Sequence, residues 1–170
     1  MSDQADPLST LSARVAELED REVIRDLDAR YCRYLDEGQW DRLADCFTED
    51  GVFDGLSRIE GRTAVRDFFA GLATSGLTAL WHHVSNLEIA VAGDAAVVRS
   101  LLWQPCVIAG VPHVSAGRYR DHVVRTPEGW RIQEKQVRFL YWSPLVDGWD
   151  QHSFGFTAAR AAATPRDTEV

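Results

Sequence analysis

The sequence predicts an α+β fold in which N-terminal helices pack on a strongly curved, mixed but mainly antiparallel sheet that wraps into a cone. Apolar residues recur at helical spacing as far as Leu72. Beyond that point the apolar residues alternate or run together between turn residues, as in strands. These runs are about 12 to 15 residues long, and strands of such length must bend and coil.

The first half of the chain predicts three helices and a short hairpin. Apolar residues at i, i+3, i+4 and i+7 are typical of a helix that faces a core. Gly38 follows the first helical pattern and is a typical helix stop. We expect helices at 11–35, 40–47 and 61–72, a turn at 48–51, and a hairpin formed by 52–54 and 57–60.

The second half predicts a meander of four long strands. Turn signals at Gly93–Asp94, Ala109–Gly110 and 126–129 separate them. Helices followed by a run of strands are an α+β pattern, and helices across the open side of the sheet would enclose one apolar pocket. We expect strands at 79–92, 95–109, 111–126 and 129–142, and one domain over 11–157 between a disordered leader, 1–10, and a flexible tail, 158–170.

Composition excludes several functional classes. The net charge is −8, and an acidic chain repels phosphate backbones, so we expect no nucleic-acid partner. No apolar run approaches the ~20 residues of a membrane helix, and no secretory signal pattern is visible. Cys32, Cys46 and Cys106 have no CxxC spacing, which argues against a disulfide framework or a thiolate metal site. Reduced thiols fit a cytoplasmic protein.

A carboxylate and a histidine are the first candidates for catalysis. Asp36 ends the first long helix, whose apolar stripe includes Tyr31. His82 and His83 are neighbours on a predicted strand, so only one of them can point into the cone. A histidine oriented by a carboxylate forms a general acid–base pair. The alternative is structural: an exposed aspartate at the helix end, a core tyrosine and a hydrogen-bonded strand histidine.

Arg138 is the candidate for stabilising negative charge. It lies among aromatic residues of the last strand, where its guanidinium could hold a carboxylate or an enolate oxygen, or simply stack on a tryptophan. No nucleophile elbow, phosphate loop or dinucleotide motif occurs, so we expect chemistry by side chains alone, without cofactor or metal. The further substrate-binding candidates are Trp81, His83, Trp103, Gln104, His113, Ser115 and Phe139.

Several segments together resemble a known family. The stretches 20–27, 31–36, 40–43 and 47–52 look like the opening of SnoaL-like domains of the NTF2-like superfamily, and Gly61–Arg62 and 129–132 are similar too. The resemblance covers about residues 18–142 and implies the cone fold. Its scytalone dehydratase, hexachlorocyclohexane dehydrochlorinase and bile-acid 7α-dehydratase branch eliminates small groups without a cofactor, using a helix aspartate and a strand histidine.

This resemblance implies roles for four residues. His82 would be the general base, Asp36 would orient it, Tyr31 would donate a hydrogen bond to a leaving oxygen or enolate, and Arg138 would stabilise negative charge. Where scytalone dehydratase has a second histidine, this chain reads Trp103–Gln104, which implies a different pocket wall.

The function implied is that of a cofactor-independent lyase or isomerase acting on a small cyclic or polycyclic organic molecule. A polyketide cyclase, which closes a ring by aldol addition, begins with the same proton abstraction and is an alternative. A non-catalytic ligand-binding module or an assembly subunit, such as the small subunit of a ring-hydroxylating dioxygenase, is another. The resemblance implies a homotrimer, with a dimer as the alternative, and the aromatic residues from Phe139 to Trp149 suggest an interface.

Overall fold

The structure is a computed structural model that describes residues 6–147. The described residues form three α-helices and seven strands, and five consecutive strands follow the third helix, which matches the predicted change from helical to strand pattern. The elements are α1 (Pro7–Asp36), α2 (Trp40–Ala44), β1 (Phe47–Asp54), β2 (Arg58–Glu60), α3 (Arg62–Thr74), β3 (Leu77–Leu80), β4 (His83–Ala92), β5 (Ala95–Ile108), β6 (Val111–Thr126), β7 (Gly129–Pro144) and a final 3₁₀ helix (Leu145–Asp147).

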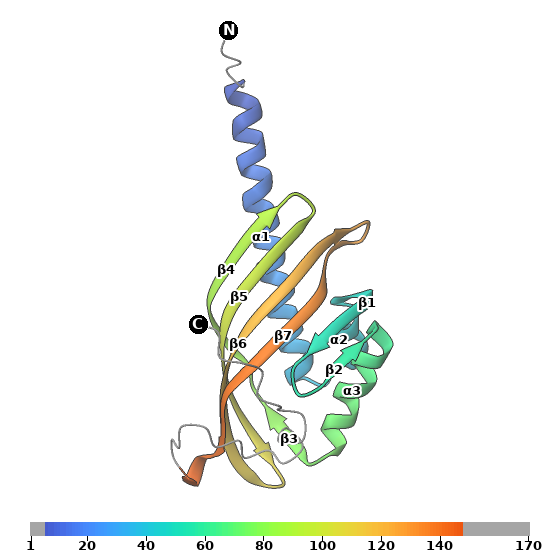
Figure 1. The fold of residues 1–170 in the computed structure, drawn as a ribbon, viewed down its shortest axis with the longest axis vertical. Helices are drawn as coiled ribbons and strands as arrows, with labels where there is room; N and C mark the ends of the chain where they lie inside the picture. The colour runs from blue at the N-terminus through green and yellow to red at the C-terminus, as the bar shows by residue number, and fades with distance from the viewer. Residues whose placement is uncertain (1–5, 148–170) are drawn as a thin grey trace.

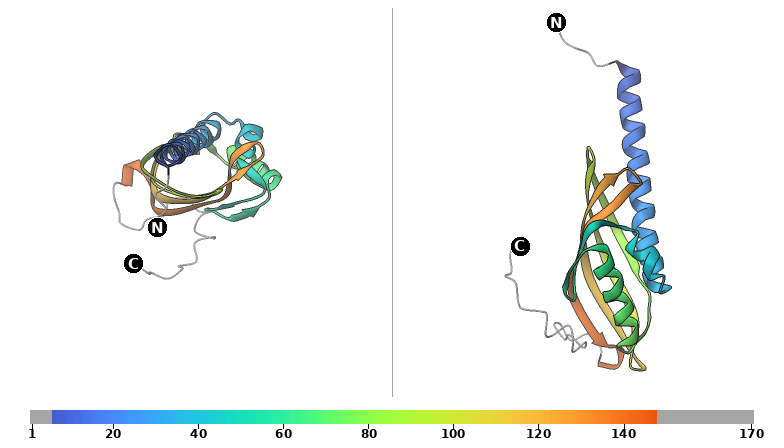
Figure 2. Two further views of the ribbon diagram at one scale, coloured as in Figure 1. Left: turned by 90° about the horizontal axis from the view of Figure 1, so that it is seen from above. Right: turned by 90° about the vertical axis from the view of Figure 1, so that its right-hand side faces the viewer.

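The seven strands form one sheet in the order β2-β1-β7-β6-β5-β3, and β4 also pairs with β5. Only the β1–β7 pair is parallel. The long strands curl around an interior, with α1 lying along one side and α3 beside β1 and β2 (Figures 1 and 2). The predicted α+β cone is confirmed. No helix within residues 6–147 is long and apolar enough to cross a membrane.

The core lies between α1 and the concave face of the sheet. Ile24, Leu27 and Tyr31 of α1 are at most 2% exposed and pack with buried residues of the long strands. The Phe53 ring of β1 meets the Phe69 ring of α3 edge to face, with centroids 4.8 Å apart. Each such side chain contributes ~1.5–3 kcal/mol when it leaves water, and together they fix α1 against the sheet.

Helix α1 begins at Pro7, inside the segment predicted to be a disordered leader. The Asp6 side chain accepts a hydrogen bond from the Leu8 amide, and proline in the first turn lacks an N–H that a helix start would leave unused. The prediction for residues 7–10 is therefore wrong. Residues 1–5 and the predicted tail, 158–170, lie outside the described residues.

Two strand predictions also differ from the structure. The predicted turn at 48–51 belongs to β1, where Phe47 pairs with Ile132 and Val52 with Glu134. The excess residues between these two pairs form an irregularity, so the turn-like sequence bulges without reversing the chain. The predicted strand 79–92 is divided into β3 and β4 at Trp81 and His82, and this division creates the site described next.

Candidate functional site

Four polar side chains form a row across three adjacent strands and the end of α1. The pairs Leu80–Cys106 and His83–Trp103 lie on either side of the gap between β3 and β4, and their shared register places His82 opposite Gln104. Gln104 in turn is opposite Ser115 on β6. Side chains at opposite positions point to the same face of a sheet and touch. The row therefore runs Asp36–His82–Gln104–Ser115.

The strand is interrupted at His82 because its backbone bonds to the helix. The amide of His82 donates to Asp36 Oδ2 over 2.9 Å. Pro105, on the neighbouring strand, has no N–H to donate across the gap, although its carbonyl accepts from the Trp81 amide at 3.1 Å. The Asp36 carboxylate thus holds the backbone beside the histidine ring through a bond that no neighbouring strand supplies.

The second oxygen of Asp36 holds the imidazole ring. His82 Nδ1 lies 2.6 Å from Asp36 Oδ1, and the His82 side chain is 3% exposed while that of Asp36 is 20% exposed. A carboxylate accepts hydrogen bonds, so this contact places the proton on Nδ1 and leaves the lone pair of a neutral ring on Nε2. His82, not His83, is therefore the inward histidine; His83 is exposed.

Gln104 and Ser115 determine which group lies against the lone pair on His82 Nε2. The Ser115 hydroxyl donates to Gln104 Oε1 over 3.0 Å, which turns the amide nitrogen of Gln104 toward His82 Nε2 at 3.2 Å. Ser115 is fully buried and Gln104 is 5% exposed. In this arrangement the amide group of Gln104 donates a hydrogen bond to the basic nitrogen of His82. The amide must move aside before a substrate can reach that nitrogen.

The row separates an outer groove from an interior cavity. The groove runs between α1 and β4 and is lined by Asp36, His82 and Trp81, among others. The cavity lies inside the cone and has a volume of about 60 Å³. Gln104, Tyr31 and Tyr119 line it among mostly aliphatic and aromatic residues. His82 borders the groove and reaches the cavity through Gln104.

Tyr31 and Tyr119 both line the cavity, and both are buried. Burial raises the pKa of both hydroxyls well above the ordinary value, so both stay protonated and can donate hydrogen bonds. Tyr31 is thus placed in the interior, as its position on the apolar stripe predicted. Asp36 and His82 do not line the same cavity.

The position expected for Arg138 is wrong. Arg138 is exposed, on the face of β7 opposite to Val137 and Phe139. Strict alternation along the strand would place Arg138 on the same face as buried Ile132, but the pairing with β6 shifts register between Ile132 and Glu134. That irregularity turns the even-numbered residues from 134 to 138 away from the cone. Arg138 therefore does not contact the site.

The seven further candidates divide between the two faces of the sheet. Gln104, Ser115 and His113 are buried, and Phe139 lines the cavity with Trp142. His113 is held by its own strand end, because its Nδ1 lies 2.8 Å from the carbonyl oxygen of Val111.

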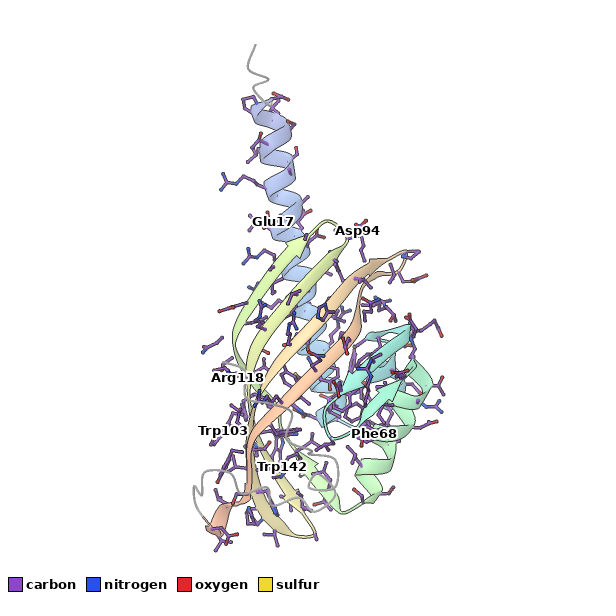
Figure 3. The ribbon with its side chains drawn as sticks, viewed as in Figure 1. Glu17, Phe68, Asp94, Trp103, Arg118 and Trp142 are labelled. Carbon is purple, nitrogen blue, oxygen red and sulfur yellow. The ribbon has the colours of Figure 1, made fainter. Side chains whose placement is uncertain are left out.

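The remaining candidates lie outside the cone. Trp81 is 51% exposed and lines only the groove, and Trp103 is 40% exposed on the outer face of β5 (Figure 3). The expectation that Trp81, Trp103 and His83 line the cone is therefore wrong, because their strand neighbours take the inward positions.

The sequence did not predict the buried charge cluster that lies beside the cavity. Lys135 is fully buried; its Nζ lies 3.1 Å from Asp28 Oδ1 and 2.6 Å from Asp121 Oδ2. The ammonium also lies over the rings of Tyr31 and Tyr119, 4.4 and 4.2 Å from their centroids. A signal was present: of the 18 basic residues in the chain, only this one is lysine.

The cluster has perturbed acid–base properties. Burial disfavours charge on Lys135, but Asp121 and Asp28 together outweigh it and raise its pKa. Burial also raises the pKa of Asp121 to about 6, although Lys135 opposes the shift, and Asp121 Oδ1 has no hydrogen-bond partner within the described residues. Two carboxylates share one ammonium, so the cluster is most compatible with burial when one carboxyl is protonated.

Replacing Asp121 with Asn should change how stability depends on pH. The folded carboxyl, with a pKa of about 6 against 3.8 in the reference state, holds its proton more tightly than the unfolded one. Its contribution to stability is therefore complete below pH ~4 and is lost as the pH rises through ~6. Urea unfolding should show the free energy of unfolding of wild type falling relative to Asp121→Asn by up to ~3 kcal/mol between these limits. A constant difference would contradict the shift.

Comparisons with known proteins agree with this architecture. The model of the SnoaL-like domain matches residues 16–136. The uncharacterized protein Rv2910c of Mycobacterium tuberculosis is 33% identical over 123 residues, which are 69% of this chain and 84% of the relative.

Two solved structures from Novosphingobium aromaticivorans have the same fold. A putative aromatic ring hydroxylase is 30% identical with a TM-score of 0.70, over 76% of this chain and 96% of that chain. A putative scytalone dehydratase is 23% identical with a TM-score of 0.68, over 79% and 91% of the two chains. At that identity the second likeness concerns the fold alone.

Proposed function

We propose, from the premise that this chain belongs to the SnoaL-like domain family, that it is a cofactor-independent lyase or isomerase using Asp36 and His82 as an acid–base pair. The observation that carries the proposal is the contact of 2.6 Å between His82 Nδ1 and Asp36 Oδ1, with His82 Nε2 directed at a residue of the cavity wall. A buried neutral imidazole with a fixed tautomer is suited to accept a proton at a defined atom.

The reaction would begin with transfer of a proton from a carbon beside a carbonyl to His82 Nε2. Asp36, already bonded to Nδ1–H, stabilises the imidazolium as it forms. The electrons left on carbon pass to the carbonyl oxygen as an enolate, to which a protonated tyrosine of the cavity can donate. In elimination a β-hydroxyl then leaves and takes the proton from His82 as water; in isomerisation the proton returns to another carbon.

The cavity favours an apolar, compact substrate. The lining residues that carry polar groups are Gln104, two tyrosines and two tryptophans, and the others are aliphatic or phenylalanine side chains. At about 60 Å³ it is smaller than the ~150 Å³ that holds a benzene ring, so binding a cyclic molecule requires lining side chains to move apart. Gln104 must also release His82 Nε2, and a substrate carbonyl can replace it as the partner of Ser115.

Deuterium exchange tests this proposal whichever product the reaction forms. The protein is incubated in D₂O with a panel of cyclic and polycyclic ketones and β-hydroxyketones, and mass spectrometry follows deuterium uptake beside the carbonyl and loss of water. Elimination, isomerisation and aldol closure all begin with this proton transfer, so any of them gives exchange above the buffer rate. Failure of every compound, with another protein co-purifying with the chain, would instead favour an assembly subunit.

Replacing Asp36 with Asn should abolish most of the activity by changing the tautomer of His82. The backbone N–H of His82 can only donate, so the Asn oxygen is expected to remain on it and the Asn amide nitrogen to face the ring. That orientation places the ring proton on Nε2 and removes the base from the cavity side. The exchange rate should fall by roughly 10²–10⁴-fold with the fold intact. Imidazole ¹⁵N shifts report the tautomer, and an unchanged rate would contradict the role given to Asp36.

A further inference from the structure

The first half of α1 carries an exposed apolar stripe beyond the body of the cone. Leu8, Leu11, Val15 and Leu18 are between 45% and 72% exposed. The sequence pattern predicts that three of them face a core, but Figure 3 places Glu17 at about the height of Asp94 in the β4–β5 turn, so the helix before it extends past the sheet. Such a stripe on an isolated surface helix is costly in water and is typical of an interface.

The stripe faces away from the cone. Asp20 of the same helix accepts hydrogen bonds from Trp130 Nε1 at 3.0 Å and from Arg125 Nη2 at 2.6 Å, and therefore faces the sheet. Each residue turns the helix by about 100°, which places Leu11 and Leu18 roughly 180–200° around the axis from Asp20. A partner can therefore approach the stripe from the side opposite to β6 and β7.

The spacing of the stripe is that of a coiled coil. Intervals of three, four and three residues assign Leu8 and Val15 to a positions and Leu11 and Leu18 to d positions of the heptad. Val15 at a, between Leu11 and Leu18 at d, is the β-branched and leucine combination that favours a parallel pair of helices. The stripe ends where Glu22 and Arg25 take the next a and d positions.

The flanking charges complement a second copy in parallel orientation. Arg14 occupies a g position and Glu19 the following e position, and in a parallel pair each g residue lies beside the next e residue of the partner. Arg21 and Asp26 repeat this relation one heptad later. An antiparallel pair would instead bring g residues together, arginine against arginine. The charges and the spacing of the stripe thus both favour a second copy of this chain, with its helix in parallel orientation.

We propose that the segment 8–21 of α1 forms a parallel two-stranded coiled coil with a second copy of this chain. The dimer axis runs along α1 on the side away from the sheet, and both cavities remain outside the interface. The proposal does not depend on the catalytic role of His82. It assigns the dimer to the N-terminal helix, whereas the sequence alone placed an interface near the aromatic residues that follow Phe139.

Sedimentation equilibrium of the full chain tests the interface. We expect wild type to have twice the chain mass of 19.1 kDa. Val15→Ser with Leu18→Ser should weaken the dimer by ~100-fold or more, because two buried apolar contacts per helix are lost. Val23→Ser is the matched control: Val23 is 44% exposed on the same helix but off the stripe, and this change should leave the mass unaltered.

Charge reversal tests the direction of the pair. Arg14→Glu alone and Glu19→Arg alone should each weaken the dimer, because like charges then meet across it, and the double exchange should restore it. In Leu18→Cys, the two copies should crosslink through residue 18 under mild oxidation, against wild type as background for the buried native cysteines. A monomeric or trimeric wild type, a dimer insensitive to the stripe variants, or a failed charge rescue would each overturn the proposal.

Discussion

His82→Ala should reduce proton abstraction by roughly 10²–10⁴-fold or more while the protein stays folded. The imidazole is the only basic group of the row with a lone pair directed toward the cavity wall, since the Gln104 amide nitrogen donates and Ser115 lies behind it. The exchange experiment in D₂O measures the loss directly, and circular dichroism and thermal unfolding monitor the fold.

His83→Ala is the matched control for that experiment. His83 is the adjacent residue and the same side chain, but it is exposed, so its removal should leave the exchange rate within about twofold of wild type. If both variants retain the wild-type rate on a turned-over substrate, the contact between Asp36 and His82 is only structural. If both lose activity equally, the effect comes from the strand break and not from the base.

Lys135→Met should be the most destabilising single substitution in the core. Methionine fills similar space, but it leaves Asp28 and Asp121 buried together without the ammonium that lies 3.1 and 2.6 Å from their oxygens. Removing one partner from a buried ionic group costs about 3–5 kcal/mol, because the remaining charge is uncompensated. Chemical denaturation at neutral pH measures the change in free energy of unfolding.

The matched variant removes the carboxylate charges as well. Lys135→Met combined with Asp28→Asn and Asp121→Asn has no buried net charge, so it should recover a large part of the lost stability. The single variant should also be less destabilised at acid pH, where Asp121, with a pKa of about 6, is protonated. A triple variant as unstable as Lys135→Met would mean that packing around the two tyrosine rings dominates the effect and charge does not.

The sequence by itself determined the fold class and most of the elements. Helical and alternating periodicities are local properties, and they placed the long first helix and the strands after Gly93 close to their observed bounds. The sequence also indicated Asp36 and His82 as candidates for an acid–base pair. Alternate residues of a strand, however, point to opposite faces of the sheet only where the pairing with the neighbouring strand is regular.

Tertiary structure decided which side chains meet. The register shift between Ile132 and Glu134 moved Arg138 to the outside and turned Lys135 to the inside, and no local pattern marks such a shift. Pairing between strands far apart in sequence set His82 opposite Gln104 and Gln104 opposite Ser115. The choice between His82 and His83 likewise followed from the hydrogen bond between the His82 backbone and Asp36, 46 residues earlier in the chain. Periodicity fixes faces within an element, whereas contacts between elements depend on register, which the whole sheet determines.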